Sequence, residues 1–143
     1  MNAAKSDFLS RSSRMMDPLS EVLSLLGAQR SVFAGLRAGG DWAIDFPPPD
    51  GIKFNAIVEG GCWLAVDGVQ QPIRLEQGDC FLLTRKRTFS LCSDLSLPAV
   101  HSDEVYCHAQ KGIARCGSAD AFFLIGGRFA FGEEANLLFA SLP

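Results

Sequence analysis

Hydrophobic and polar residues alternate with a period of two along most of the chain. Segments with this alternation, or with a short continuous apolar run, cover residues 31–38, 41–46, 52–58, 62–66, 72–75, 80–83, 88–92, 113–116, 121–125 and 128–131. A period of two is typical of β-strands, because successive side chains point to opposite faces of a sheet. About ten short strands, separated by Gly, Pro and Asp turns, predict an antiparallel sandwich or a closed barrel.

The stretch 55–89 carries the clearest strand and turn pattern. Asp67-Gly68 is a typical hairpin turn, and Gly78-Asp79 precedes the next apolar strand, where we expect Asp79 to bond the backbone of its own turn. The strand 52–58, which overlaps the start of this stretch, is partly apolar on both faces. It places Lys53, Asn55 and Ile57 on one side, so we expect it to be a central strand.

The ends of the chain have a different pattern. Asp17 can cap a helix, Pro18 fits its first position, and apolar residues recur at helical spacing through 17–26. An amphipathic pattern starts again at Glu133. We therefore predict a mainly all-β fold with a short N-terminal helix and a C-terminal helical start. Residues 1–15 are expected to be a flexible tail, and 16–143 one domain.

Three segments near the C-terminal half are less regular. Residues 93–101 read as a loop, and 102–109 fit neither a helix nor a strand clearly. Residues 121–125 are continuously apolar, which predicts a fully buried strand, and Gly126-Gly127 is expected to bend it before 128–131.

Composition narrows the classes of function. The 143 residues are 48% hydrophobic and carry a net charge of −3. This charge argues against a nucleic-acid-binding surface, which needs clustered Lys and Arg. No run approaches the ~20 apolar residues that cross a bilayer, and no secretory signal is visible. We expect a cytoplasmic protein that makes no contact with membranes.

Few residues are suited to catalysis or metal binding. The chain has no common catalytic motif, and its only histidines are His101 and His108. A metal site would have to recruit both, together with Asp103 or Glu104. Surface histidines are the simpler interpretation, so we expect no metal, no cofactor and no enzyme activity.

The five cysteines allow a second hypothesis. Their number is odd and no pair has C-x-x-C spacing, which argues against a disulfide framework or a zinc site. Cys92, Cys107 and Cys116 lie in or beside predicted loops, where oxidation is easiest. These three are candidates for a redox sensor, and the alternative is that they are buried and inert.

The central stretch resembles a known family. VEGGCWLAVDG at 58–68 and IRLEQGDCFLL at 73–83 are similar to the central part of a cupin. DPLSEVL at 17–23, GRFAF at 127–131 and NLL at 136–138 narrow the resemblance to the N-terminal cupin domain of AraC-type transcriptional regulators. The resemblance implies a double-stranded β-helix, or jelly-roll, barrel.

Two departures from the family pattern shape the functional hypothesis. Metal-using cupins carry His and Glu ligands, but residues 46–58 contain neither, and Phe89 stands where a second-motif histidine would be. A metal-free barrel is therefore expected. Regulators of this type continue into a helix-turn-helix region, whereas this chain stops at Pro143.

The resemblance therefore implies a ligand-sensing and dimerisation domain, with DNA contacted only by a further domain. A small-molecule effector would bind inside the barrel. The candidate lining residues are Asn55, Ile57, Trp63, Phe81 and Phe89. Three alternatives stay open: a cysteine-based redox sensor on the same fold, a cupin enzyme with a non-standard metal site, and a structural dimerisation domain whose barrel is filled.

Overall fold

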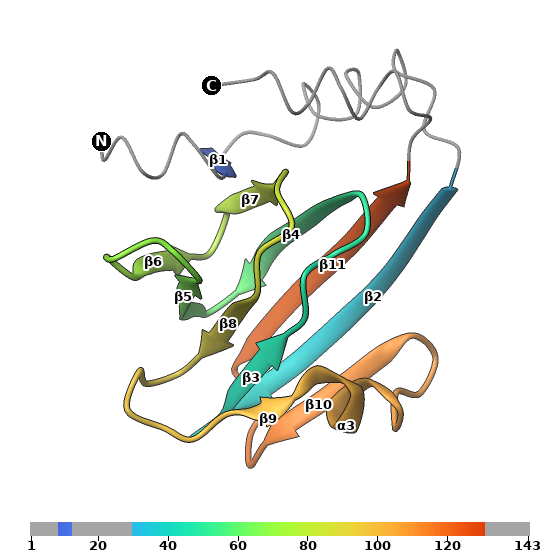
Figure 1. The fold of residues 1–143 in the computed structure, drawn as a ribbon. Coiled ribbons are helices and arrows are strands. Elements are labelled where there is room, and N and C mark those ends of the chain that lie inside the picture. The colour runs from blue at the N-terminus through green and yellow to red at the C-terminus, as the bar shows by residue number, and fades with distance from the viewer. Residues whose placement is uncertain (1–8, 13–29, 131–143) are drawn as a thin grey trace.

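The computed structural model describes residues 9–12 and 30–130, which form two β-sheets and one short helix (Figure 1). The elements are β1 (Leu9–Ser12), β2 (Arg30–Gly39), β3 (Ala43–Phe46), β4 (Ile52–Glu59), β5 (Gly61–Val66), β6 (Ile73–Glu76), β7 (Cys80–Leu83), β8 (Phe89–Cys92), β9 (Val100–His101), α3 (Ser102–Tyr106), β10 (Ile113–Gly117) and β11 (Phe122–Ala130). The six-stranded sheet has the order β1-β7-β4-β11-β2-β10, and the five-stranded sheet has the order β6-β5-β8-β3-β9.

The two sheets confirm the predicted all-β jelly-roll architecture. Strand pairs are antiparallel except β2 with β10 and β3 with β9. As expected, β4 is a central strand, between β7 and β11. The predicted turns are present as well: Gly68 and Gly78 have φ of 84° and 90°, and Asp79 Oδ2 accepts the Glu76 N–H at 2.9 Å.

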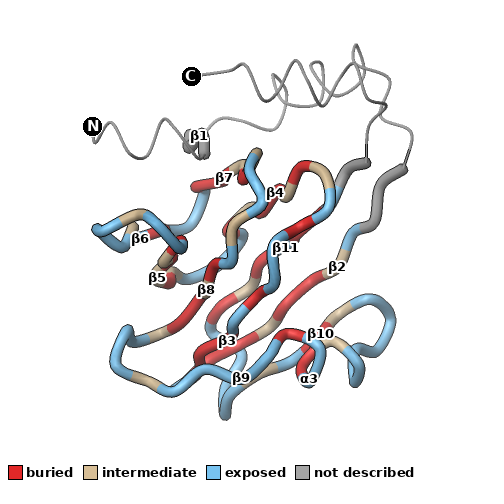
Figure 2. The backbone as a smooth tube through the Cα atoms, in the orientation of Figure 1, coloured by how far each residue is buried: buried red, intermediate tan, exposed pale blue. Residues whose placement is uncertain are grey.

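The hydrophobic core lies between the two sheets. The six-stranded sheet contributes Leu36, Ile57 and Leu124, and the five-stranded sheet contributes Leu64 and Leu91, all at most 2% exposed. Figure 2 shows buried backbone along β2, β4, β8 and β11, while the connecting loops are exposed. The alternation of buried and exposed residues in the strands is the period of two seen in the sequence.

One strand differs from the prediction. Gly126-Gly127 does not bend the chain, because β11 runs unbroken through both glycines while pairing with β2 on one side and β4 on the other. The prediction of a fully buried strand was also wrong. Ile125 is 40% exposed, since it lies on the outer face of the sheet, opposite to Leu124.

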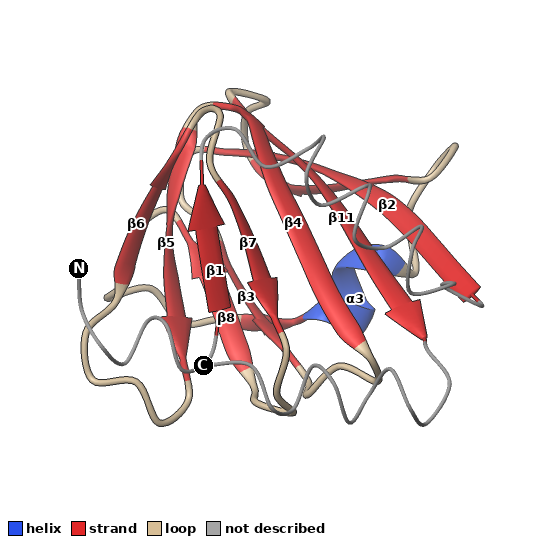
Figure 3. Cartoon of the chain, turned by 90° about the horizontal axis from the view of Figure 1, so that it is seen from above, coloured by secondary structure: helices blue, strands red, loops and turns tan. Residues whose placement is uncertain are grey.

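The segment that the sequence left ambiguous forms α3. His101 caps it, and its Nδ1 accepts the Asp103 N–H at 3.1 Å. The helix contacts β9 and β10, the edge strands of the two sheets, and so closes one side of the space between them (Figure 3). The helices predicted at 17–26 and from Glu133 lie outside the described residues. In the described ranges, no helix has the length and hydropathy required to cross a membrane.

The packing between the sheets gives a stability prediction. Leu64→Ala is expected to lower the free energy of unfolding by about 2–5 kcal/mol, because it leaves a void among fully buried neighbours. Leu95→Ala removes the same atoms from a side chain that is 47% exposed, and should change stability by about 0.5 kcal/mol or less. Denaturant unfolding of both variants measures the difference, and equal losses would contradict the placement of the core.

Candidate functional site

A cavity of about 320 Å³ opens at one end of the space between the sheets. This volume lies at the small end of the roughly 300–1,000 Å³ that is typical of small-molecule sites. Both sheets and α3 contribute to its wall. The lining residues are Ala34, Phe46, Pro47, Pro48, Pro49, Lys53, Phe89, Ser102, Asp103, Tyr106, Gly126 and Arg128.

Aromatic rings form the apolar side of the cavity. Phe46 on β3 and Phe89 on β8 are stacked, with ring centroids 4.7 Å apart and planes 4° apart. Phe81, from the opposite sheet, meets Phe89 edge-on at 6.3 Å, and Tyr106 on α3 meets Phe46 edge-on at 6.1 Å. These contacts cross between elements, so the wall is held in place by packing on several sides.

Two cations form the polar side. Lys53 on β4 and Arg128 on β11 are partners in the strand register, so both side chains leave the same face of the sheet. Burial and the Arg128 charge lower the pKa of the half-buried Lys53 amine to about 8. Of the other groups lining the cavity, Asp103 and Tyr106 on α3 are titratable, while the β7 partner of Lys53 is the apolar Leu83.

A buried asparagine lies next to the cavity wall. Gly126 lines the cavity, and a Cβ atom at this position would come within 2.6 Å of Asn55 Oδ1 and 3.3 Å of Lys53 Nζ. Asn55 is 2% exposed, and its Nδ2 has no hydrogen-bond partner. A buried donor without a partner is costly, and Nδ2 of Asn55 is the one such side-chain atom among the described residues.

The structure separates the residues expected to line the barrel. Phe89 lines the cavity, whereas Asn55, Ile57 and Phe81 are buried deeper between the sheets. The placement of Trp63 in the interior was wrong. Cys62, Leu64 and Val66 take the core face of β5, so Trp63 lies on the other face, half-buried beneath Arg74, whose guanidinium carbon is 5.4 Å from its ring centroid.

Sequence reasoning missed the two cations of the cavity. The alternation in 52–58 does put Lys53 on the same face as Asn55 and Ile57. The charge of Lys53 on a strand face that otherwise points into the core could therefore have indicated a polar site in the interior. Arg128 could not be found in this way, because its position depends on how β11 pairs with β4.

The histidines do not form part of a metal site among the described residues. There, no group of three or more His, Cys, Asp and Glu side chains is arranged to hold an ion. His101 precedes α3 and binds its first turn, and His108 follows the helix as an exposed residue. The pattern that the sequence required, both histidines with Asp103 or Glu104, is not assembled.

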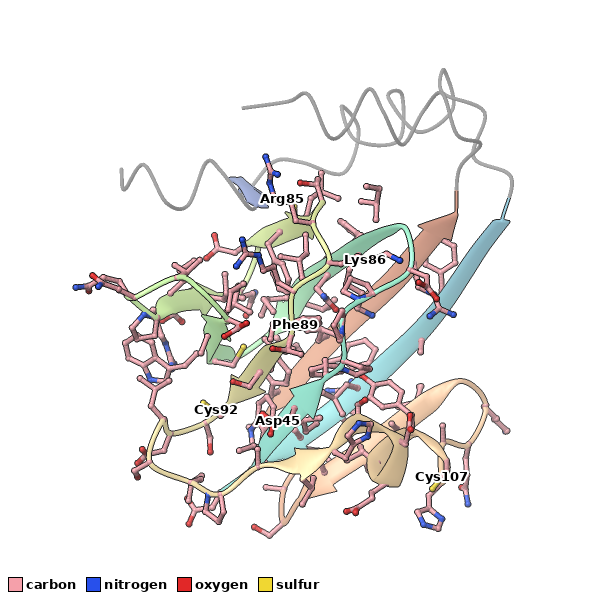
Figure 4. All side chains as sticks on the ribbon, in the orientation of Figure 1. Asp45, Arg85, Lys86, Phe89, Cys92 and Cys107 are labelled. Atoms are coloured by element: carbon pink, nitrogen blue, oxygen red, sulfur yellow. The ribbon has the colours of Figure 1, made fainter. Side chains whose placement is uncertain are left out.

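The three cysteines proposed as redox candidates differ in exposure, and two of them fit the alternative of a buried thiol. All five are free thiols, but Cys92 is only 4% exposed and Cys116 is half-buried within β10. Burial raises the pKa of both thiols, and it raises that of Cys62 to about 12. Only Cys107, after α3, is exposed, and Figure 4 shows it far from Cys92. The redox hypothesis is therefore restricted to one thiol.

Comparison with known proteins shows the family of this chain. A model of the cupin family matches residues 17–143. Proteins from Streptomyces antibioticus and Streptomyces lividans, each provisionally named an AraC-like transcription regulator, are 50% identical over 129 residues, which is 90% of this chain. The match covers 43% and 42% of those proteins, so the chain spans less than half of their length.

A solved structure is similar as well. A cupin protein from Bacteroides fragilis aligns with 93% of this chain and 84% of its own, with 16% sequence identity and a TM-score of 0.42.

The thiol environments predict an order of reactivity. Iodoacetamide at pH 8 should alkylate Cys107 first and leave Cys62 unmodified in the folded protein, because only the thiolate reacts and burial disfavours it. Peptide mass spectrometry after timed quenching measures the order, with Cys107→Ser as the control that removes the fast site. Early modification of Cys62 or Cys92 would contradict the described burial.

Proposed function

This chain belongs to the cupin family, and we propose that it is the effector-sensing and dimerisation domain of an AraC-like transcription regulator. The observation that carries this proposal is the cavity between the sheets, which has an aromatic wall and two cations. The 50% identity to two proteins named as such regulators supports the regulatory role.

The construction of the cavity suits a sensor. Its wall combines β2, β4 and β11 of one sheet, β3 and β8 of the other, and α3 at the joined edges. A ligand that contacts all three parts binds best to one relative arrangement of them. Differential affinity for two arrangements is what lets an effector shift a regulator between states.

The remaining parts of the proposal concern partners. The proposed dimer follows from the resemblance, and the surfaces that the sequence suggested for it, 17–26 and the segment from Glu133, lie outside the described residues. DNA contact would come from a part of the longer regulator that is not in this chain. Since such a regulator acts on the chromosome, we propose a cytoplasmic location.

We also propose that the domain is not an enzyme and that its cavity works without a metal. The residues around the cavity provide two cations, hydroxyl groups and the carboxylate of Asp103, but no His or Cys. Among the described residues, no three His, Cys, Asp or Glu side chains lie close enough together to hold a metal ion. Binding and release, rather than bond cleavage, are the chemistry that these groups support.

A ligand screen tests the sensing proposal. At least one compound in a library of small water-soluble metabolites should raise the melting temperature of the chain, because binding to the folded state stabilises it. Ala34→Leu places a larger side chain in the cavity and should abolish that shift. Ala99→Leu, at an exposed position outside the cavity, is the matched control and should respond like the unmodified chain.

Two results would contradict the proposal. One is a library in which no compound shifts the melting temperature. The other is a shift that Ala34→Leu leaves unchanged, since the ligand would then bind elsewhere. Circular dichroism of both variants without ligand checks that each retains the fold.

A further inference from the structure

The cavity holds two like charges side by side. Lys53 and Arg128 are directly opposite each other in the β4–β11 register. Like charges directly opposite on neighbouring strands are destabilising. Of the described residues, none forms an ion pair with either side chain. The sheet therefore keeps an uncompensated pair of cations on the face that lines the cavity.

The one carboxylate of the wall does not neutralise them. The side chain of Asp103 is 91% exposed, and its Oδ2 lies 3.7 Å from Nδ1 of His101 rather than against either cation. A neighbouring groove of about 530 Å³, which shares Phe46 and Phe89, is different in charge: its ionisable residues are Asp45, Asp67 and His101. Of the two spaces, only the first presents positive charge to a ligand.

A neutral donor adds to the cations. Gly126 lines the cavity and the atom of Asn55 nearest to it is the acceptor Oδ1, so this donor is not the buried Nδ2 of Asn55. Tyr106 also lines it, and burial raises the pKa of its hydroxyl to about 12, so the hydroxyl stays protonated and can donate. The Lys53 and Arg128 cations and the Tyr106 phenol together form a set of hydrogen-bond donors, and the natural ligand of such a set is an anion with oxygen acceptors.

We propose that the cavity binds a small organic carboxylate, with its carboxylate between Lys53 and Arg128 and its apolar body against Phe46 and Phe89. The volume of about 320 Å³ and the stacked rings require a compact ligand with a flat or hydrocarbon body. This inference rests on the proposed function, because it names the chemical class of the effector.

The test compares acids with their uncharged counterparts. Benzoate, phenylacetate and 3-phenylpropionate, and the three corresponding amides, are titrated into the chain by calorimetry at pH 7 and constant ionic strength. At least one acid should bind, and its amide should bind about tenfold or more weakly, because it lacks the charge that the two cations recognise.

Four variants test whether Lys53 and Arg128 bind the carboxylate of the ligand. Lys53→Gln and Arg128→Gln should each weaken binding of that acid about tenfold or more, whereas Lys53→Arg keeps a cation and should retain most of the affinity. Arg115→Gln, which removes an exposed arginine paired with Asp120, is the matched control and should bind like the unmodified chain. Arg128 is exposed, so its variant remains informative if the Lys53 variant fails to fold.

The results separate this inference from the function on which it rests. Amides that bind as well as acids, or an acid whose affinity neither Gln substitution lowers, would overturn the carboxylate inference and leave the cavity as a sensor of another class of molecule. Failure of every acid to bind would overturn the inference as well. The metabolite screen then tests separately whether the chain is a ligand sensor, because the screen makes no assumption about the charge of the ligand.

Discussion

The antiparallel pairing of β4 with β11 is the constraint on which the site depends. Because side chains alternate along a strand, a slip of one residue would turn Lys53, Asn55 and Ile57 to the outer face of the sheet. The observed register instead puts Lys53 next to Arg128, and Asn55 next to Gly126. A bulge adjusts it nearer the end of β4, where Phe123 pairs with Glu59 and the next residue of β11 pairs with Ile57.

The second sheet supplies what the first lacks. β3 and β8 bring Phe46 and Phe89 across the core, and α3 joins the edges β9 and β10 so that Tyr106 reaches the same space. The wall of the cavity is therefore formed by a cationic face of one sheet, an aromatic face of the other sheet and the helix α3. No single segment of the sequence contains it, and a ligand held by all three would report on their relative position.

The sequence predicted the strands well because a period of two and Gly-Asp turns are local features. It predicted poorly wherever pairing decides the outcome. Trp63 was assigned to the interior although the alternation in β5 gives that face to Cys62 and Leu64. Gly126-Gly127 was expected to bend a strand that two neighbours hold straight. Arg128 entered the site only through the register, which no local pattern encodes.

The protonation of Lys53 tests the account most directly. NMR of the chain with ¹⁵N-labelled lysine, followed from pH 6 to 11, should show one side-chain amine that titrates near pH 8, with Lys53→Arg removing that signal. Arg128→Gln should raise its pKa, because the neighbouring cation favours the neutral amine. An ordinary value near 10.5 for Lys53, unchanged by Arg128→Gln, would contradict the paired cations and the site built on them.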